Sequence, residues 1–505
     1  MTTMIGPLRR AVQVGADRPA VVCGDDQLTY AEMWDRCARL AGALSDLGLE
    51  PGDRVAVVAP NCHRYLELYQ AVPGAGFVLV PLNQRHTEAE LRYALEDSGT
   101  RVLFAGRDIG GLGEVVEHVI DLGEGYEKLL AGANPVEFPE DLSDATLAGL
   151  FYTGGTTGAA KGVMLTHRNL VANALHFQVF WPFRPETCWL IAAPLFHAAG
   201  SVAVLATVWN GGRHVVLPAF DAATGLDLIE RHGVTATLVV PTMLAALTDE
   251  QVARPRDVST LQAISHGGSP VATETVRRAH DAFPGAGLYH LYGATETAPI
   301  ATTLRDEELL IDSQRICSCG QAAVGVEVDI IGEDGRPVPR GQVGEVVVRG
   351  DNVMVGYWNK PEQTEAALVD GWYRTGDLGY MDDEAFVYLV DRAKDMIVTG
   401  GENVYSTEVE DALYRHPAVL EAAVFAVPDP HWGEAVHAVV VPRREVTERE
   451  LIAHCRALIA DYKVPKHVEL RTEPLPKSGA GKVLKRVLRE GEQHQGSDGS
   501  NLRKS

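Results

Sequence analysis

The sequence predicts an α/β protein: a large N-terminal domain of mainly parallel sheets flanked by helices, a β-rich subdomain, and a small C-terminal α+β domain. Three observations support this fold class. Short β-branched runs alternate with helix-like segments from Arg54 onward, a pattern typical of parallel strands joined by helical crossovers. Short apolar runs with Asp-Gly turns occupy residues 324–388, as in a β-rich unit. A compact mixture of helical and extended patterns follows residue 391.

The alternation in the first half of the chain is regular. Strand-like runs at residues 54–60, 77–82 and 101–106 flank helix-like segments at 61–76 and 87–99. Thr87 and Glu90 form the pattern of a capping box at the start of the second helix. Further apolar runs that extend the same theme lie at Leu147–Tyr152, His214–Leu217, Thr235–Val240 and Leu261–Ser265.

The second half changes character twice. Turns at Asp334-Gly335 and Asp370-Gly371 separate short strands. Beyond them we expect a helix from near Ser406, strands at 418–427 and 435–441, a helix over 447–460 and a strand at 467–472. Thr447 and Glu450 again form a capping-box pattern.

The length of 505 residues, with 46% hydrophobic and 22% charged residues, is that of a globular protein with more than one domain. We expect an N-terminal domain over residues 1–391 and a C-terminal domain over 392–490. Residues 491–505 contain almost no large apolar side chain, so we expect a disordered tail there.

Charge and cysteine content restrict the partners and the compartment. Lys+Arg 45 against Asp+Glu 68 gives a net charge of −23, which argues against nucleic acid as a partner. The seven cysteines show no CxxC pair, so we expect a reduced, cytoplasmic protein. Residues 187–212 carry no charged side chain, but proline, histidine and a Gly-Gly pair interrupt them, so no integral membrane segment is expected.

The most informative segment is Tyr152–Gly162, YTGGTTGAAKG, directly after an apolar run. Glycines let backbone N–H groups turn toward an anion, hydroxyls add donors, and Lys161 adds a cation, which together suit a phosphate. The spacing excludes a Walker A loop, because Lys161 is followed by Gly162 and not by Ser or Thr. Taken alone, the segment is either such a phosphate loop or a flexible strand-to-helix turn.

This segment resembles the phosphate loop YTSGTTGxPKG of the adenylate-forming superfamily, which includes acyl-CoA synthetases, firefly luciferase and peptide synthetase adenylation domains. Other motifs follow in the order of that superfamily: Tyr292–Glu296, Tyr373–Asp377, Asp391–Asp395 leading into Gly400–Asn403, and Pro476–Lys482. The chain is most similar in pattern to bacterial AMP-forming fatty or aryl acid–CoA ligases. Gly154 and Ala160 depart from the usual Ser and Pro, and neither change removes a charge.

The resemblance implies two half-reactions: a carboxylate and ATP give acyl-AMP and pyrophosphate, and CoA then gives the thioester and AMP. It implies Mg²⁺ as a cofactor, ATP and CoA as co-substrates, and a mobile C-terminal domain. Residues implied as catalytic are Lys482, Thr157 and Glu296, of which Glu296 would bind the metal. Residues implied for ATP or AMP are Thr153, Gly154, Gly155, Thr156, Thr157, Lys161, Gly268, Ser269, Tyr292, Gly293, Thr295, Asp377 and Arg392.

The acid and the acceptor have implied sites as well. Residues implied for the acid are His197, Ala198, Gly200 and Gly293. Residues implied for CoA are Gly400, Gly401, Glu402 and Trp432, although a buried structural role fits Trp432 equally well. Lys394 occupies the hinge position of the superfamily.

The substrate class is only partly restricted. Amino-acid-activating relatives place a buried Asp near residues 187–212 to pair with the substrate ammonium, because an unpaired buried charge is costly. This chain has no acid there, so a hydrophobic fatty or aryl monocarboxylic acid is expected. The alternatives are an adenylation enzyme that loads a carrier protein and a catalytically silent binding protein. A luciferase-like oxidation is a minor alternative, and the oligomeric state stays open, with a homodimer among the options.

Overall fold

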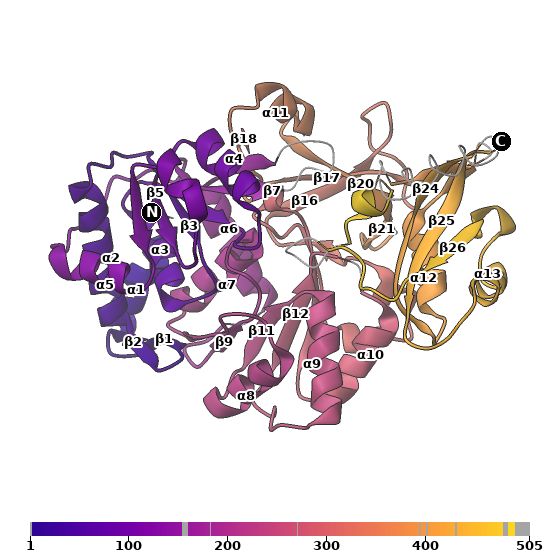
Figure 1. The fold of residues 1–505 in the computed structure, drawn as a ribbon, viewed down its shortest axis with the longest axis horizontal. Helices are drawn as coiled ribbons and strands as arrows, with labels where there is room; N and C mark the ends of the chain where they lie inside the picture. The colour runs from indigo at the N-terminus through magenta and orange to yellow at the C-terminus, as the bar shows by residue number, and fades with distance from the viewer. Residues whose placement is uncertain are drawn as a thin grey trace, which may run out of the picture. The chain divides into compact units, whose positions relative to one another are not determined.

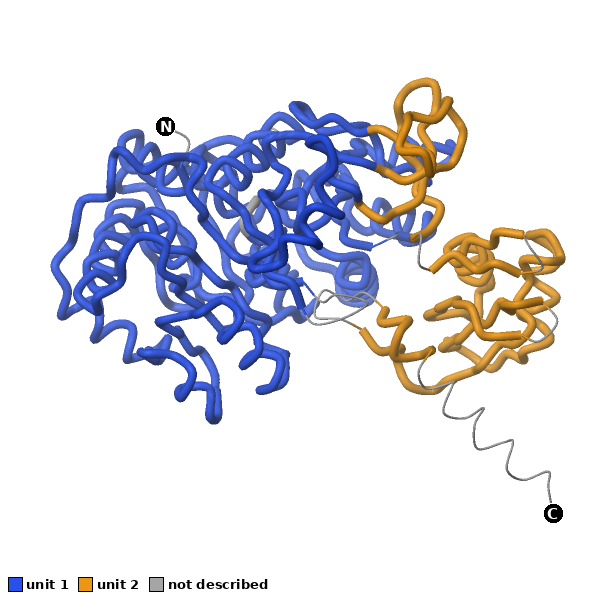
Figure 2. Tube along the Cα trace, turned by 90° about the horizontal axis from the view of Figure 1, so that it is seen from above, with its two compact units in different colours: residues 1–328, 347–374 blue, residues 329–346, 375–505 orange. Residues whose placement is uncertain are grey.

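The computed structural model describes residues 3–153, 160–181, 183–269, 271–392, 395–399, 402–429, 432–477 and 483–489, without the side chains of residues 201–202. Figure 2 shows two compact units, residues 1–328 with 347–374 and residues 329–346 with 375–505. Residues 329–346 and 375–391, both expected in the N-terminal domain, fall in the second unit by this division. The boundary at 391/392 stays a prediction.

The first unit contains a seven-stranded sheet with the predicted alternation. Its order is β18 (Gly356–Tyr357), β8 (Lys161–Thr166), β7 (Leu147–Thr153), β4 (Val78–Leu82), β3 (Arg54–Val58), β5 (Thr100–Ala105) and β6 (His118–Asp121). Strands β7, β4, β3, β5 and β6 run parallel, and β8 and β18 are antiparallel additions at one edge. Helices α3 (His63–Gly74) and α4 (Glu88–Ser98) are the predicted crossovers.

The second sheet of this unit has nine strands. Its order is β15 (Gln321–Ala322), β14 (Thr302–Leu304), β13 (Gly287–Tyr292), β12 (Ala263–Gly267), β11 (Ala236–Val239), β9 (Cys188–Ile191), β10 (Arg213–Val216), β1 (Pro19–Cys23) and β2 (Asp26–Thr29). The six strands from β13 to β1 are parallel. Helices α8 (Ala222–His232), α9 (Pro241–Ala253) and α10 (Thr273–Ala282) lie side by side along this sheet (Figure 1).

Burial and capping explain why these elements form. All of β3 from Val55 to Val58 is buried, as expected for a central parallel strand covered on both faces. The Thr87 hydroxyl accepts from the Glu90 backbone N–H, and the Glu90 carboxylate accepts from Thr87, so the predicted capping box is confirmed. The remaining helices of this unit are α1 (Gly6–Gly15), α2 (Tyr30–Asp46), α5 (Glu124–Gly132), α6 (His167–Phe180), α7 (Ala198–Trp209) and α11 (Pro361–Ala367).

A third sheet forms the β-rich part of the chain. Its strands are β16 (Val326–Ile331), β17 (Gly344–Gly350), β20 (Trp372–Met381) and β19 (Leu368–Val369), with β21 (Val387–Arg392) paired to β20. Asp370 and Gly335 both have a positive φ in the predicted turns, the conformation that Asp-Gly turns require.

The end of the second unit is the predicted α+β fold. Its sheet has the order β23 (Glu402–Val404), β22 (Ile397–Thr399), β25 (Gly433–Pro442) and β24 (Val419–Asp429), with β26 (His467–Leu470) beside β25. Helix α12 covers Ser406–Tyr414, and α13 covers Glu448–Arg456, shorter than the predicted 447–460. The capping box of Thr447 and Glu450 is present.

Two further observations concern compartment and membranes. All seven cysteines are free thiols. Within the described ranges, every helix is too short or too polar to cross a bilayer.

Candidate active site

The Gly/Thr-rich loop joins two antiparallel strands. Thr153 at the end of β7 pairs with Lys161 at the start of β8, so the loop closes a hairpin. The sequence expectation of a strand-to-helix loop is therefore wrong: a six-residue strand follows the loop, and α6 begins only at His167. The predicted ATP contacts Gly154, Gly155, Thr156 and Thr157 lie outside the residues that the structure describes.

Asp97, at the end of α4, fixes the base of this hairpin. Its carboxylate accepts a hydrogen bond of 2.7 Å from the Tyr152 hydroxyl and one of 3.0 Å from Lys360 Nζ. Its backbone carbonyl accepts one of 3.0 Å from Trp358 Nε1. Burial raises the pKa of Tyr152, and Asp97 adds to the effect, so the phenol stays a donor. Asp97 was not predicted, because no local sequence pattern connects it with the loop.

Lys161 and Glu296, two predicted site residues, share one neighbour, Tyr357. The Lys161 ammonium lies 4.4 Å from the centre of the Tyr357 ring, in range of a cation–π interaction. The Tyr357 hydroxyl donates a 2.8 Å hydrogen bond to Glu296 Oε1. The structure thus brings the loop lysine and the predicted metal ligand into one cluster.

The turn that carries Glu296 is held by two buried amides. Asn173 Nδ2 donates to the carbonyls of Thr297 and Ile300 at 3.2 and 3.1 Å. Asn352 Nδ2 donates to the same two carbonyls at 2.9 and 2.8 Å. Because both amides are buried, these bonds are shielded from competing water. The predicted contact Thr295 begins this turn.

Gly293 precedes this turn and has no room for a side chain. A Cβ at this position would lie 1.9 Å from the carbonyl oxygen of Pro299 and 2.8 Å from Thr297 Oγ1. Such distances require backbone movement. The absence of a side chain at Gly293 therefore allows the backbone at Pro299 to pack closely against it. The preceding residue, Tyr292, ends β13 and is partly buried.

The turn of Gly268 and Ser269 follows the parallel strand β12. Gly268 has a φ of +83° and open space around the Cβ position, as a tight turn favours. Gly267, the last residue of β12, approaches the Leu291 carbonyl so closely that a Cβ would lie 2.1 Å from it. The predicted nucleotide residues at the ends of β12 and β13 are therefore on adjacent strands.

A buried polar cluster lies beneath this strand end. His266 Nε2 shares a short hydrogen bond with a carboxylate oxygen of Glu307, and the His266 and His290 rings stack with centres 5.2 Å apart. Burial opposes ionisation of Glu307, but His266 lowers the pKa of that carboxyl overall. Burial lowers the pKa of His290 to about 4. Glu307 and His290 were not predicted, since each looks like an ordinary loop or strand residue in the sequence.

The predicted acid-binding loop is anchored by buried polar groups. His197 is the residue before α7, and its ring lies 4.5 Å from the Phe196 ring. Asn61 Oδ1 accepts from the Leu195 N–H at 2.8 Å. The Tyr69 hydroxyl donates to the Leu195 carbonyl at 2.5 Å. Asn61 and Tyr69 thus position the loop that carries His197, and neither was predicted.

The small residues after His197 also have a packing role. A Cβ on Gly200 would lie 2.9 Å from Leu195 Cα, so the missing side chain accommodates the loop itself. Ala198 is buried. That this region leaves room for an acid remains a prediction.

The predicted ribose-binding pair lies in the second unit. Asp377 and Arg392 face each other across β20 and β21, and Arg392 Nε lies 3.0 Å from Asp377 Oδ1. The Asp377 backbone N–H donates to Thr375 Oγ1 at 3.0 Å, and Gly376 between them has a φ of +70°. The order Thr-Gly-Asp therefore shapes the backbone before the Asp377 side chain, and Arg392 contacts the carboxylate.

The predicted hinge and acceptor residues are only partly covered. Lys394, Gly400, Gly401 and Lys482 lie outside the described residues. Glu402 is exposed on β23. Trp432 is 46% exposed, which excludes the alternative of a buried structural tryptophan.

Next to the hinge position lies a buried charged network. Asp391 accepts from the backbone N–H and hydroxyl of Ser406 at 2.5 and 3.1 Å. Lys485 Nζ donates to the Ser406 hydroxyl at 2.7 Å and lies 2.8 Å from Glu410 Oε1. Burial raises the pKa of Asp391, and the positive charge of Lys485 offsets only part of this rise. The segment before Lys394 is therefore tied to α12.

The acidic side chains near the site determine how Mg²⁺ would be bound. Among the described residues no group of three or more His, Cys, Asp or Glu side chains is placed to hold a metal. A single carboxylate, Glu296, suits a Mg²⁺ ion that keeps most of its ligands from ATP oxygens and water. The residues present thus fit a metal that enters with the nucleotide.

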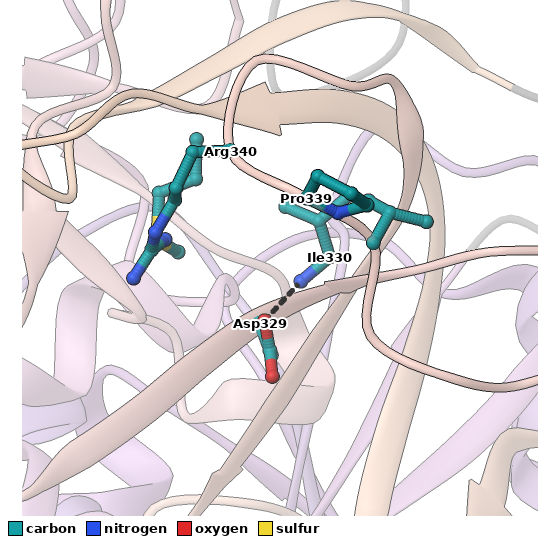
Figure 3. A pocket seen from close by; sticks show the side chains of 6 residues that line it. Asp329, Ile330, Pro339 and Arg340 are labelled. Atoms are coloured by element: carbon teal, nitrogen blue, oxygen red, sulfur yellow. Dashed lines mark hydrogen bonds between the residues drawn. The ribbon is translucent and has the colours of Figure 1, made fainter.

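One pocket of the second unit lies apart from every predicted site residue. It is lined by Asp329, Ile330, Val338, Pro339, Arg340 and Met381 (Figure 3). The Asp329 carboxylate accepts from the Ile330 N–H at 2.8 Å. Pro339 and Arg340 are exposed, so the pocket is a shallow surface feature, and we assign it no function.

Comparison with known proteins agrees with this arrangement. The AMP-binding enzyme family matches residues 8–358, and the AMP-binding enzyme C-terminal domain matches residues 408–482. A feruloyl-CoA synthase of Amycolatopsis sp is 41% identical over 96% of this chain and 97% of its own. The fatty acid–[acyl-carrier-protein] ligase ScoC of Streptomyces coeruleorubidus is 36% identical over 94% of this chain and 93% of its own.

Solved structures give the same result. The o-succinylbenzoate CoA synthetase of Bacillus subtilis, in complex with its acyl-adenylate intermediate, superposes with a TM-score of 0.88. It is 32% identical and covers 97% of this chain and 99% of its own. The family match, the identity over nearly the full length and the cluster of Lys161 and Glu296 together establish that this chain is an enzyme of the AMP-binding, adenylate-forming superfamily.

Proposed function

We propose that this enzyme is an ATP-dependent acid–CoA ligase for a hydrophobic monocarboxylic acid, with an aryl acid as the first choice. The cluster in which Tyr357 contacts both Lys161 and Glu296 carries the proposal. A cation and a metal-binding carboxylate next to a glycine-rich hairpin are what ATP activation requires.

In the first half-reaction an oxygen of the substrate carboxylate attacks the α-phosphorus of ATP, and the bond from that phosphorus to pyrophosphate breaks. Lys161 would bind the departing phosphates, and Glu296 would hold Mg²⁺. The metal would neutralise phosphate charge. Lys482 would stabilise the negative charge where the carboxylate meets the α-phosphate, and Asp377 with Arg392 would hold the ribose hydroxyls.

In the second half-reaction the CoA sulfur attacks the acyl carbon, and the bond from that carbon to AMP breaks. The thiol proton leaves to solvent, and AMP departs as the anion. Lys394 would act as the hinge that exchanges the two active conformations. Gly400, Gly401, Glu402 and the exposed Trp432 would meet the acceptor.

Two observations support the proposed class of acid substrate: the lack of an acidic side chain near the predicted acid site, and the similarity to a feruloyl-CoA synthase. Neither β9 nor the described side chains of α7 include an acid that could pair with a substrate ammonium, so an amino acid is disfavoured. The relative that is 41% identical is a feruloyl-CoA synthase, which favours an aryl acid over a fatty acid. The cytoplasmic location, the homodimer and the assignment to lipid metabolism stay predictions.

A second candidate is transfer to a carrier protein, because the relative that is 36% identical is a fatty acid–[acyl-carrier-protein] ligase. Both candidates share the first half-reaction and differ in the acceptor. A silent binding protein of the same fold is disfavoured, because Lys161, Glu296, Asp377 and Lys482 are all retained.

The experiment is pyrophosphate release from Mg·ATP with benzoic, phenylpropenoic and fatty acids, with and without CoA. We expect release that CoA stimulates, with a thioester detected by mass. Release without a thioester, followed by acylation of a holo-carrier protein, would support the second candidate. Lys482→Ala should abolish acyl-AMP formation, and Arg486→Ala at an exposed position nearby is the control. Acyl-AMP formation by Lys482→Ala at the normal rate would show that the proposed mechanism is wrong.

A further inference from the structure

Tyr357 lies between two opposite charges and is itself rigidly held. Its side chain is buried, with 6% of the residue exposed. Its position is fixed by the pairing of β18 with β8, in which Tyr357 faces Val163. Its backbone N–H donates to Thr364 Oγ1 at 2.9 Å, so both the strand and the following helix restrain it.

The two charges do not pair directly. Among the ion pairs that join described residues, no pair within 4.0 Å links Lys161 with Glu296. Instead, the Lys161 ammonium contacts the Tyr357 ring face, and Glu296 Oε1 accepts from the Tyr357 hydroxyl. The ring face attracts the cation, and the hydroxyl at the ring edge binds the anion, so one side chain satisfies both groups.

This arrangement matters because a direct ion pair would occupy both groups. A lysine and a glutamate in contact attract each other strongly where water is largely excluded. Each would then have to break that pair before binding a phosphate or a metal. A cation–π contact and a hydrogen bond from a neutral phenol are weaker and leave the charges available.

We propose that Tyr357 is a positioning residue that keeps the Lys161 ammonium and the Glu296 carboxylate apart and oriented, so that Lys161 can bind the terminal phosphates of Mg·ATP and Glu296 can bind its metal. This inference rests on the proposed function, since it assigns the two groups to the nucleotide. The geometry carries the inference, because the phenol donates to Glu296 Oε1 at 2.8 Å while its ring face contacts the Lys161 ammonium.

Two variants separate the two contacts of Tyr357. Tyr357→Phe keeps the ring face beneath Lys161 and removes only the hydrogen bond to Glu296. Tyr357→Leu removes both contacts and lets Lys161 and Glu296 approach each other. The matched control is Tyr126→Phe, because the Tyr126 hydroxyl also donates to a buried glutamate, Glu67, at 2.6 Å in the same unit.

The measurement is binding of Mg·ATP and of AMP to the full chain by calorimetry, with no carboxylic acid present, so that no turnover occurs. We expect Tyr357→Phe to weaken Mg·ATP binding about fivefold and Tyr357→Leu at least about tenfold, as loss of one or two contacts implies. AMP lacks the β- and γ-phosphates, so its affinity should change less than about twofold in both variants. Tyr126→Phe should bind both ligands like the wild type.

The outcomes separate this inference from the proposed function. If the wild type binds no Mg·ATP, the proposed function fails. If the wild type binds Mg·ATP and both Tyr357 variants bind it equally well, the positioning role is wrong. A parallel loss of AMP and Mg·ATP affinity would also overturn it, because it would show a general structural role. A selective loss for Mg·ATP, larger for leucine than for phenylalanine, supports it.

Discussion

The Tyr152 hydroxyl donates a 2.7 Å hydrogen bond to the carboxylate of Asp97, a residue 55 positions earlier in the chain. Tyr152 is the last residue before Thr153 and the glycine-rich loop, and the Asp97 side chain is only 11% exposed. The loop that we assign to ATP phosphates therefore begins at a point fixed by a largely buried carboxylate on helix α4.

Asp97→Asn should loosen this anchor, because the neutral amide loses its charged bond with Lys360. We expect the KM for ATP to rise about 3- to 30-fold and the free energy of unfolding to fall by about 1–3 kcal/mol. The KM for the acid should change less. Steady-state kinetics and urea unfolding measure both effects. Asp35→Asn, which breaks an exposed ion pair with Arg39, is the control, and an equal effect from both variants would contradict the anchoring role.

Gly293→Ala should destabilise the turn that carries Glu296. The new Cβ would lie 1.9 Å from the Pro299 carbonyl oxygen, so the backbone must move, at a cost of about 1–3 kcal/mol. A lower urea midpoint and weaker Mg·ATP binding are expected together. Gly132→Ala adds a methyl group where no atom lies within 4 Å and should leave both unchanged. Wild-type stability of Gly293→Ala would show that the Pro299 carbonyl does not restrict this position.

His214, buried in β10 between the parallel strands β9 and β1, should make the enzyme less stable in acid. Burial lowers its pKa to about 4 in the folded chain, from the ordinary histidine value of 6.5. The unfolded chain therefore binds more protons between these values, and stability falls as the pH drops through that window. His214→Gln should reduce the loss between pH 7.5 and 5.0 by about 2 kcal/mol. Unfolding curves at the two pH values test this, with the exposed His467→Gln as control, and identical curves for the wild type and His214→Gln would refute it.

Asp377→Asn should weaken ATP binding through the ribose. The amide has the same shape but loses the negative charge that pairs with Arg392 at 3.0 Å, so we expect the Kd for ATP to rise about 10-fold or more. The same substitution should matter less for 2′,3′-dideoxy-ATP, which offers no hydroxyl to the carboxylate. The Kd values of the wild type and of Asp377→Asn are measured for both nucleotides, and the two ratios are compared. Equal penalties for both would exclude a contact from Asp377 to the ribose.

Local patterns were enough to predict much of the fold. The alternation at residues 54–105 and the capping boxes at Thr87 and Thr447 depend on neighbours a few residues apart, and both are present. Strand β8 was missed because Lys161–Thr166 is short and its role depends on pairing with β7 and β18. Nothing within the segment itself distinguishes such a strand from the start of a helix.

In the candidate site, too, some residues could be predicted from local sequence motifs and others could not. Lys161, Glu296, Asp377 and Arg392 lie in motifs that are read from consecutive residues. Their supporting partners do not: Tyr357 lies 61 positions from Glu296, and Asn352 lies 55 positions from Thr297. Contacts over such distances come from tertiary packing, and a single sequence carries no periodic signal for them. The residues that orient the site therefore require the structure.

The pairing of Thr153 with Lys161 has a consequence for how this enzyme can vary. Side chains alternate between the two faces of a strand, so a register shift of one residue would turn Lys161 to the opposite face, away from the Tyr357 ring. An insertion or deletion within β8 itself would cause such a shift, because β8 pairs with β7 on one side and with β18 on the other. Engineering near the loop should therefore leave the residue count of β8 unchanged.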